Sequence, residues 1–442
     1  MNIPSPGIIK KRVVIVGGGF GGLSLANKLD SKLFQVVLLD KNNYHIFQPL
    51  LYQVASSGLE AEAISFPFRN FLQKRKGFYF RLAEVKSIDP QNNSIITSIG
   101  RLSYDYLVIA TGTTTNFFDN KNIIDNALPM KSIEEAMILQ NTLLLNIEKS
   151  LTVNDPEQRL SLLNVVIVGG GATGVEIAGA ISEMKRFVIP KDYPELKDSS
   201  LNIYVIEGSQ ILASMSDKAS AKAKGFLEKM GVNLLIGKRV QDYKDGCVVL
   251  DDGNKIPTDT LIWVSGVISD KIDGFAEYQI GNNGRIIVDE FNLTKGLNNV
   301  YVIGDTCIQE SESYPKGHPQ VAPVAIQQGR NLARNLNHRI KEKSLTSFKY
   351  KNRGTLATVG RNRAVADLPR VKFNGFFAWL MWLFIHLHYI LGVRNKIIVS
   401  LNWAWNYFNY SRSMHFIFFD PKKTKNKIVN TDEGKYKDTS SK

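Results

Sequence analysis

The feature that most constrains the fold of this chain is a seven-residue string that occurs twice. Residues 13–19 read VVIVGGG, and residues 165–171 read VVIVGGG again, 152 positions later. A second pair follows, because residues 104–112 read YDYLVIATG and residues 258–266 read TDTLIWVSG, at an offset of 154. Two pairs at nearly the same offset indicate an internal duplication, because chance likeness of apolar strands would not repeat both order and spacing.

Each copy begins with a strand of β-branched residues, followed at once by a glycine turn and a helical pattern. This alternation predicts an α/β fold in which crossover helices connect parallel strands. A third strand of this kind, NNVYVIGD, ends at Asp305. We therefore expect one domain from residues 8–120 and 295–340, with a second domain, 121–294, inserted between its halves. A C-terminal region should cover 341–420, and the lysine-rich tail 421–442 is expected to be disordered.

The first copy carries the spacing of a loop that cradles a phosphate. Gly17-x-Gly19-x-x-Gly22 directly follows a strand and opens a helix, so free backbone N–H groups and the helix dipole face an anion. The next strand, FQVVLLD, ends in Asp40, where a carboxylate can accept both ribose hydroxyls of a dinucleotide. The candidate contacts in and after this loop are Gly17, Gly18, Gly19, Phe20, Gly21, Gly22, Asp40 and Lys41.

The second copy repeats the cradle as Gly169-x-Gly171-x-x-Gly174, and its next strand, LNIYVIE, ends at Glu207. A carboxylate there favours a ribose 2′-OH and repels a 2′-phosphate, which predicts NADH rather than NADPH. Thr173, in the first turn of the helix, joins the candidate contacts. Two Rossmann-like sites in one chain suit a resident FAD, bound non-covalently, and a visiting NADH that delivers hydride to it.

Composition narrows the class of chemistry and the choice of partner. Lysine and arginine number 55 against 41 acidic residues, a net charge of +14 that suits an anionic partner. The two cysteines, Cys247 and Cys307, form no CxxC or Cys/His cluster, so we expect neither a metal site nor a disulfide framework. The N-terminus lacks the pattern of a secretory signal, since a strand follows the basic residues 10–12 directly.

Beyond the cradles, several motifs resemble the two-dinucleotide-binding-domain flavoprotein superfamily. Ala110-Thr111-Gly112 is similar to its ATG motif, and Gly266 closes the counterpart in the NADH domain. YVIGD, ending at Asp305, resembles its second FAD motif, and Val85 falls where the backbone meets the adenine.

Within this superfamily the chain most resembles the type II NADH:quinone oxidoreductases, single-subunit NADH dehydrogenases that pump no protons. Four stretches carry the resemblance: FQPLLYQVASSGL (47–59), GGGATGVEIAGAI (169–181), VAPVAIQQG (321–329) and RGTLATVGRNRAV (353–365). The C-terminal run that begins GFFAWLMWLFIHLHYILGV also resembles the membrane-binding end of that family.

The resemblance implies roles for particular residues. Ala322 and Pro323 would begin a helix aimed at the flavin, and Gln327 would approach both flavin and quinone. The family has a first glutamine where this chain has Pro323, so Gln320 or Gln328 could replace it. Glu176 would face the nicotinamide and flavin, for positioning or proton delivery. The remaining implied contacts are Gln48 for flavin and quinone, and Arg353 and Leu356 for quinone.

Residues 375–393 contain no Asp, Glu, Lys or Arg. Such a run is long enough to span a bilayer, but His386 and His388 would be costly at its centre. Trp379 and Trp382 are instead typical of a membrane interface. This segment alone therefore allows three interpretations: a helix in a soluble core, a helix that spans the membrane, and a helix that lies at the membrane interface.

The segment that follows favours the interface. Helical spacing in 396–408 puts Ile397, Leu401, Ala404, Trp405 and Phe408 on one side and asparagines on the other. We therefore expect residues 374–410 to form a monotopic anchor on the cytoplasmic side of the cell inner membrane. It would attract anionic lipid and contribute to a homodimer.

The function expected from these features is FAD-dependent oxidation of NADH with two-electron reduction of a membrane quinone, menaquinone or ubiquinone; no nucleic acid is expected as a partner. The alternatives are a sulfide:quinone oxidoreductase, which needs a cysteine pair beside the flavin, and another FAD-dependent NADH reductase with a different acceptor. A catalytically silent redox sensor that docks on membranes is a rival of another class.

Overall fold

The structure is a computed structural model that describes residues 3–7, 9–72, 75–196, 201–409, 416, 417 and 419. The chain divides into two compact units. Unit 1 comprises 1–46, 65–114 and 267–353, and unit 2 comprises 47–64, 115–266 and 354–442. These bounds differ from the expected domain ranges, because 47–64 and the C-terminal region group with unit 2 and 267–294 groups with unit 1. The expected disordered tail, 421–442, lies outside the described residues.

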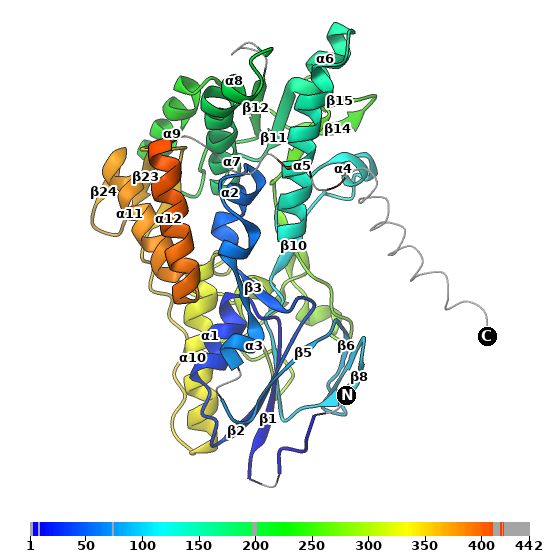
Figure 1. Cartoon of the computed structure of the whole chain (residues 1–442). Helices are drawn as coiled ribbons and strands as arrows, with labels where there is room; N and C mark the ends of the chain where they lie inside the picture. Colours follow the sequence, from blue (N-terminus) through cyan, green and yellow to red (C-terminus); the bar gives the residue numbers. More distant parts are fainter. Residues whose placement is uncertain are drawn as a thin grey trace, which may run out of the picture. The chain divides into compact units, whose positions relative to one another are not determined.

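A five-stranded parallel sheet forms the centre of unit 1 (Figure 1), in the order β20-β9-β1-β2-β5. Its core strands are apolar on both faces, as buried parallel strands require. Their bounds are β1 (Lys11–Val16), β2 (Phe34–Asp40), β5 (Phe78–Leu82), β9 (Tyr106–Ile109) and β20 (Val300–Val302). The helices α1 (Phe20–Lys28) and α10 (Ala322–Ile340) pack so closely that a Cβ on Gly329 would lie 2.4 Å from the Gly21 carbonyl oxygen.

Smaller elements complete unit 1. An antiparallel meander of β6, β7 and β8 packs beside the main sheet, and His45 of β3 pairs with β4. Their bounds are β3 (Tyr44–Ile46), β4 (Ser65–Pro67), α3 (Phe68–Leu72), β6 (Val85–Asp89), β7 (Ser94–Thr97), β8 (Gly100–Ser103), β10 (Thr113–Thr115), β18 (Val267–Ser269), β19 (Ile286–Ile287) and β21 (Cys307–Ile308), with 3-10 turns η4 (Glu277–Gln279), η5 (Asn282–Gly284) and η6 (Gly304–Thr306).

Unit 2 repeats the arrangement of unit 1 around a four-stranded parallel sheet, β13-β12-β11-β17. Its strands are β11 (Asn164–Val168), β12 (Asn202–Glu207), β13 (Val232–Ile236) and β17 (Thr260–Trp263), and a meander of β14 (Val240–Lys244), β15 (Cys247–Leu250) and β16 (Lys255–Pro257) follows. The order strand, glycine turn, helix, strand, meander, strand is thus the same in both units. The predicted α/β fold with two dinucleotide-binding domains is confirmed.

Helices flank the sheet of unit 2. The longest is α5, whose start is fixed by a capping box in which Ser132 and Glu135 satisfy each other's backbone N–H groups. The elements are η1 (Gln48–Leu50), α2 (Leu51–Ala55), η2 (Ala61–Ile64), α4 (Lys121–Asn126), α5 (Ile133–Ser150), α6 (Pro156–Leu163), α7 (Ala172–Glu183), the π-helical η3 (Met184–Val188), α8 (Ile189–Asp192) and α9 (Asp217–Lys229).

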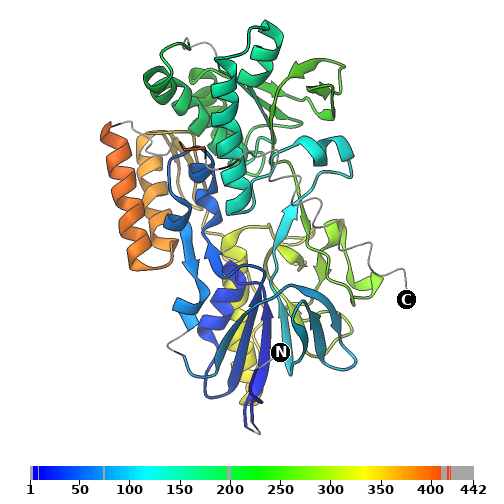
Figure 2. The same ribbon diagram turned by 45° about the vertical axis from the view of Figure 1, so that its right-hand side comes forward.

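The C-terminal part of unit 2 is a three-stranded sheet followed by two helices. The strands are β22 (Thr355–Thr358), β23 (Ala364–Asp367) and β24 (Lys372–Asn374), and the helices are α11 (Phe376–Tyr389) and α12 (Val393–Asn409). The charge-free run 375–393 therefore contains all of α11 and the turn at Gly392, which has φ +82°, and it ends at the first residue of α12. Both views show α11 and α12 side by side (Figures 1 and 2). Among the described residues, no helix combines the length and the apolar character needed to cross a membrane.

Candidate active site

The glycine loop of unit 1 has the shape of a phosphate cradle. A Cβ on Gly17 would lie 2.3 Å from the Ala110 carbonyl oxygen, and one on Gly22 would lie 2.0 Å from the Gly17 oxygen. Both positions therefore admit only glycine. Gly19, by contrast, has no atom within 4 Å of its would-be Cβ and faces open space. That free volume, beside the N-terminus of α1, fits the pyrophosphate of a dinucleotide.

Asp40 is tied to this loop. One of its carboxylate oxygens accepts the Gly18 N–H at 2.7 Å, and the other accepts the Asn42 N–H at 2.7 Å. Burial raises the pKa of Asp40, while the two backbone N–H groups oppose the rise. The carboxylate is thus fixed at the end of β2, with lone pairs left for ribose hydroxyls.

His45 also supports the loop, and sequence spacing gave no sign of it. Its Nδ1 lies 3.0 Å from the Gly18 carbonyl oxygen, and its ring packs edge-on against Phe20. Burial lowers the pKa of His45 to about 4, so the ring is neutral near pH 7. Because a carbonyl only accepts, the proton of the neutral ring lies on Nδ1.

The second cradle repeats this geometry within unit 2. A Cβ on Gly174 would lie 1.8 Å from the Gly169 oxygen, while Gly171 faces open space. Glu207 accepts the Gly170 N–H at 2.7 Å with one carboxylate oxygen and the Ser209 N–H at 2.9 Å with the other. The acid that follows each cradle is therefore bound to the middle glycine of GGG, a duplication at the level of single hydrogen bonds. Thr173 is exposed in the first turn of α7.

The turn at Gly304 and Asp305 is held from several sides. Buried Gln328 accepts the Gly304 N–H at 2.7 Å and donates to Gln309 at 2.9 Å. Arg285 donates to the Asp305 carbonyl at 3.1 Å, and so does the Gln320 amide at 3.0 Å. The two glutamines considered as replacements at the quinone site are therefore engaged with this turn.

The neighbouring ATG segment closes the same site in unit 1. The Thr306 hydroxyl donates to the Gly112 carbonyl at 2.8 Å, and its oxygen lies 3.2 Å from the Thr111 hydroxyl. The Ala110 N–H donates to the Val16 carbonyl at 2.7 Å.

The other expected dinucleotide contacts lie as follows. Val85 begins β6, and Lys41 forms an exposed ion pair with Asp270, in which Nζ lies 3.7 Å from Oδ2. In unit 2, Gly266 has φ +85° and lies beside the ring of Phe118.

The candidate quinone contacts are distributed over both units. Gln327 lies in unit 1, where its amide donates to the Lys351 carbonyl and accepts the Lys351 N–H, both at 3.0 Å. Gln48 lies in unit 2, and its amide donates to the Lys131 carbonyl at 3.4 Å. Leu356 packs in the small core under α11, and Arg353 is exposed before β22. Ala322 and Pro323 begin α10 as expected, after an N-cap residue that provides no side-chain cap.

Glu176 is a buried acid of unit 2 with a strongly raised pKa. It lies on α7 with 8% of its surface exposed. Burial raises its pKa to about 8, and the Thr358 N–H, 3.5 Å away, opposes the rise only weakly. The Trp382 indole also lowers the pKa, although its N–H has no acceptor within hydrogen-bonding distance among the described residues. Glu176 is therefore mainly a neutral acid at pH 7 that can donate a hydrogen bond.

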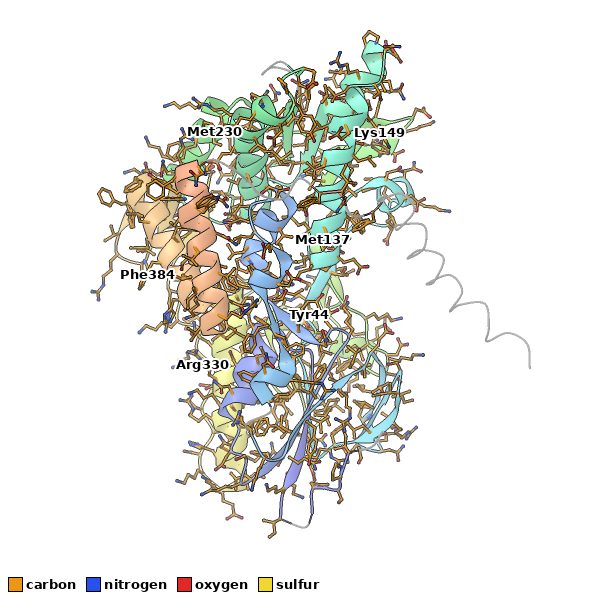
Figure 3. The ribbon with its side chains drawn as sticks, in the orientation of Figure 1. Tyr44, Met137, Lys149, Met230, Arg330 and Phe384 are labelled. Carbon is orange, nitrogen blue, oxygen red and sulfur yellow. The ribbon has the colours of Figure 1, made fainter. Side chains whose placement is uncertain are left out.

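The two C-terminal helices turn apolar faces outward. On α12, Leu401 is 64% exposed, Trp405 61% and Phe408 78%. The asparagine side faces inward, because Asn406 donates to the Gly58 carbonyl at 3.0 Å and Asn395 is buried. On α11, Phe384 is 72% exposed and projects from the outer side of the helix (Figure 3).

His386, in the charge-free run, is buried and held by contacts within its helix. His386 stacks on Trp382 with ring centroids 3.9 Å apart, and its Nδ1 lies 2.7 Å from the Trp382 carbonyl oxygen. Burial lowers the pKa of His386 to about 4, which keeps the ring neutral. Its ring also packs edge-on against Phe47, so this histidine belongs to the packing of α11 against segment 47–64 and is no obstacle to an outward apolar face.

Comparisons with known proteins identify the family of the chain. The family model described as pyridine nucleotide-disulphide oxidoreductase matches residues 11–329, and that described as NDH2 C-terminal domain matches residues 352–412. The type II NADH:quinone oxidoreductase Ndh of Mycobacterium tuberculosis is 32% identical over 91% of this chain and 89% of its own length.

The chain belongs to the type II NADH:quinone oxidoreductases. Another member, from Haemophilus influenzae, is 29% identical over 81% of this chain and 87% of its own length. Members of the family use FAD, with NADH as substrate, and the two cradles fit those dinucleotides.

Solved structures show the same fold. NDH2 of Plasmodium falciparum in complex with NADH has a TM-score of 0.85 at 22% identity, covering 90% of this chain and 98% of that one. The sulfide:quinone oxidoreductase of Aquifex aeolicus has a TM-score of 0.70 at 19% identity, covering 91% and 96%. The two cysteines that the sulfide alternative would need as a pair are free thiols in different units, Cys247 in β15 of unit 2 and Cys307 in β21 of unit 1. Among the described residues, no cluster of three or more metal-ligating side chains occurs.

Proposed function

We propose that this chain oxidises NADH at a resident FAD and reduces a membrane quinone to quinol without pumping protons. The observation that carries the proposal is the doubled cradle, in which Asp40 and Glu207 bind the middle glycine of their loops in the same way. A bound FAD would supply two-electron transfer from NADH to an acceptor. The rest of the chemistry is binding, orientation and proton handling by the chain.

The first cradle suits the resident dinucleotide. Gly17, Gly19 and Gly22 shape the loop, and Ala110, Thr111 and Gly112 with the Asp305 turn close it. The Ala322 N–H and the positive end of the α10 helix dipole would favour negative charge on the bound cofactor, and Pro323 fits the first turn because no N–H is needed there.

The second cradle suits NADH. Gly169, Gly171, Thr173, Gly174 and Gly266 would surround the nicotinamide dinucleotide, and Glu207 would accept from the ribose hydroxyls and repel a 2′-phosphate. Glu176, neutral at pH 7, would donate a hydrogen bond from its carboxyl group toward the bound substrate. Proton delivery to the quinone is the second role open to this acid.

The exposed apolar side chains on the outer faces of α11 and α12 support monotopic association with a membrane. Fully burying a large apolar side chain such as Phe or Leu contributes about 1.5–3 kcal/mol, so a few of these residues entering lipid would hold the chain on a bilayer. We place it on the cytoplasmic side of the inner membrane, attracted to anionic lipid, as a homodimer. Gln48, Gln327, Arg353 and Leu356 are the proposed quinone contacts.

A steady-state assay in liposomes tests the proposal. NADH with a menaquinone or ubiquinone analogue should be turned over rapidly, and NADPH should be at least tenfold poorer because of Glu207. Glu207→Gln should narrow the preference for NADH. Turnover with sulfide as donor, or no turnover with either quinone class, would contradict the proposed reaction.

A further inference from the structure

A half-buried arginine of unit 1 joins two segments of the proposed FAD site that are separate in the sequence. Arg285 follows the turn η5 and directly precedes β19, in which Ile286 pairs with Cys307 of β21. The Gly281 N–H donates to the Arg285 carbonyl at 2.7 Å. The backbone of this arginine is therefore held by a turn on one side and by a strand pairing on the other.

The guanidinium group of Arg285 donates to three backbone carbonyl oxygens. Its Nε donates to Asp305 at 3.1 Å, and its Nη2 donates to Cys307 and, at 3.3 Å, to His318. Because the donor is charged, such hydrogen bonds are roughly twice as strong as bonds between neutral groups. One side chain thus holds the turn at Asp305, the start of β21 and the segment 318–321 that leads into α10.

The Asp305 carbonyl oxygen connects the same turn and segment a second time. It accepts the side-chain amide of Gln320 at 3.0 Å in addition to Arg285, so both of its lone pairs are used. Gln320 lies two residues before Ala322, the first residue of α10. The Asp305 turn and the N-terminus of α10 are therefore tied to each other through one carbonyl oxygen and the two side chains that bind it.

The direction of this carbonyl also affects the ATG segment. The Asp305 carbonyl and the Thr306 N–H belong to one planar peptide group. The Thr306 hydroxyl donates to the Gly112 carbonyl at 2.8 Å. Rotation of that peptide group would therefore disturb the closure of the ATG segment together with the Asp305 turn.

We propose that Arg285 is a positioning residue of the FAD site, which sets the Asp305 turn and the N-terminus of α10 where both can face one bound FAD. It acts through the backbone, since its bonds are to carbonyl oxygens. Asp305 is the expected contact of the ribityl and phosphate part, and the positive end of the α10 dipole favours negative charge on the cofactor. The inference rests on the proposed FAD site of unit 1.

Arg285→Met tests the proposal, because methionine keeps an unbranched side chain and has no donor. Release of FAD from the holo form on dilution is followed by flavin fluorescence, and circular dichroism of the visible flavin bands reports how the remaining FAD is held. The Kd for FAD should rise about tenfold or more, the size expected for lost charge-assisted hydrogen bonds. The visible dichroism of the flavin that stays bound should also change.

Arg75→Met is the matched control. Arg75 is another half-buried arginine of unit 1, and it donates to the backbone carbonyls of Ala26 at 2.7 Å and Leu29 at 2.9 Å, at the C-terminal end of α1. This variant should lower the melting temperature and leave the Kd and the flavin dichroism as in the parent. Equal changes in the two variants, or parent-like values for Arg285→Met, would overturn the proposal.

A double-mutant cycle tests the shared carbonyl. Because Arg285 and Gln320 bind the same oxygen, the Kd of Arg285→Met with Gln320→Leu should differ at least threefold from the product of the single effects. Arg75→Met with Gln320→Leu should give that product. Simple products in both cycles would overturn the proposed link.

A conservative variant covers the case in which Arg285→Met does not fold. Arg285→Lys keeps the charge but loses the planar fork, so it should raise the Kd for FAD about threefold. A Kd equal to that of the parent would then overturn the proposal. Failure of the proposed function would appear in the parent chain itself, as protein that retains no FAD.

Discussion

Replacing Glu176 by glutamine should change how the stability of the chain depends on pH. The acid is 8% exposed, and burial raises its pKa from 4.5 to about 8. Between those two values the unfolded chain binds fewer protons than the folded chain, so the stability falls as the pH rises through this window. The loss is absent below the unfolded-state pKa and complete above the folded-state pKa.

The magnitude follows from the shift. Each unit of pKa corresponds to about 1.4 kcal/mol, so at pH 7 the ionised unfolded form disfavours folding by roughly 3 kcal/mol. Glutamine has nearly the shape of the neutral acid and no proton to lose. Glu176→Gln should therefore match the parent chain near pH 5 and exceed it increasingly up to pH 8, by several degrees in melting temperature.

Thermal unfolding of the holo form, followed by circular dichroism at pH 5, 6, 7 and 8, measures this difference. Glu157→Gln, at an exposed position of α6, provides the matched control and should show a difference that does not change with pH. A constant difference between Glu176→Gln and the parent chain at all four pH values would refute a neutral, desolvated acid at this position.

Three further predictions concern the cradles and their supports. Gly171→Ala should leave the fold intact, because its Cβ would enter only open space, and should raise the KM for NADH at least tenfold, because that space is where the pyrophosphate would bind. Gly174→Ala should instead destabilise unit 2, because its Cβ would lie 1.8 Å from a backbone oxygen. Melting curves and steady-state kinetics separate the two effects, and a KM of Gly171→Ala equal to that of the parent would contradict the cradle. Asp40→Asn should lower FAD retention on gel filtration, because an amide has one oxygen, so it cannot accept the Gly18 and Asn42 N–H groups on separate oxygens and leaves one acceptor fewer for ribose. Retention equal to that of the parent would count against the assignment. Gln328→Leu should likewise raise the Kd for FAD, because the Gly304 N–H would lose its acceptor. Leaving such a buried group unsatisfied costs about 1–3 kcal/mol. An unchanged Kd would show that the Gly304 turn keeps its shape without Gln328.

The two nucleotide folds could be predicted from sequence because their determinants are local. A buried strand, a glycine turn and a following helix recur at a fixed offset, and an acid ends the next strand. The helical spacing of Ile397, Leu401, Trp405 and Phe408 likewise predicted the outward apolar face of α12, because residues three or four apart lie on one side of a helix.

The supports of the site could not be read from sequence, because they depend on contacts between distant segments. His45 reaches the Gly18 carbonyl from a strand 27 positions away. Gln328 was considered for the quinone, yet the packing of α10 buries it against the Gly304 turn. The neutral state of His386 likewise comes from its burial, which no pattern in the charge-free run reveals. The boundaries of the compact units differ from the expected ranges for the same reason, because segment 47–64 packs with elements far along the chain.

Anaerobic rapid mixing of the purified, yellow chain with NADH, while the flavin absorbance near 450 nm is followed, tests the two dinucleotide sites most directly. The band should bleach within milliseconds to seconds and return when a short-chain quinone is added. Protein that is purified without flavin, or flavin that keeps its colour in excess NADH, would contradict the claim that one cradle holds FAD and the other admits NADH.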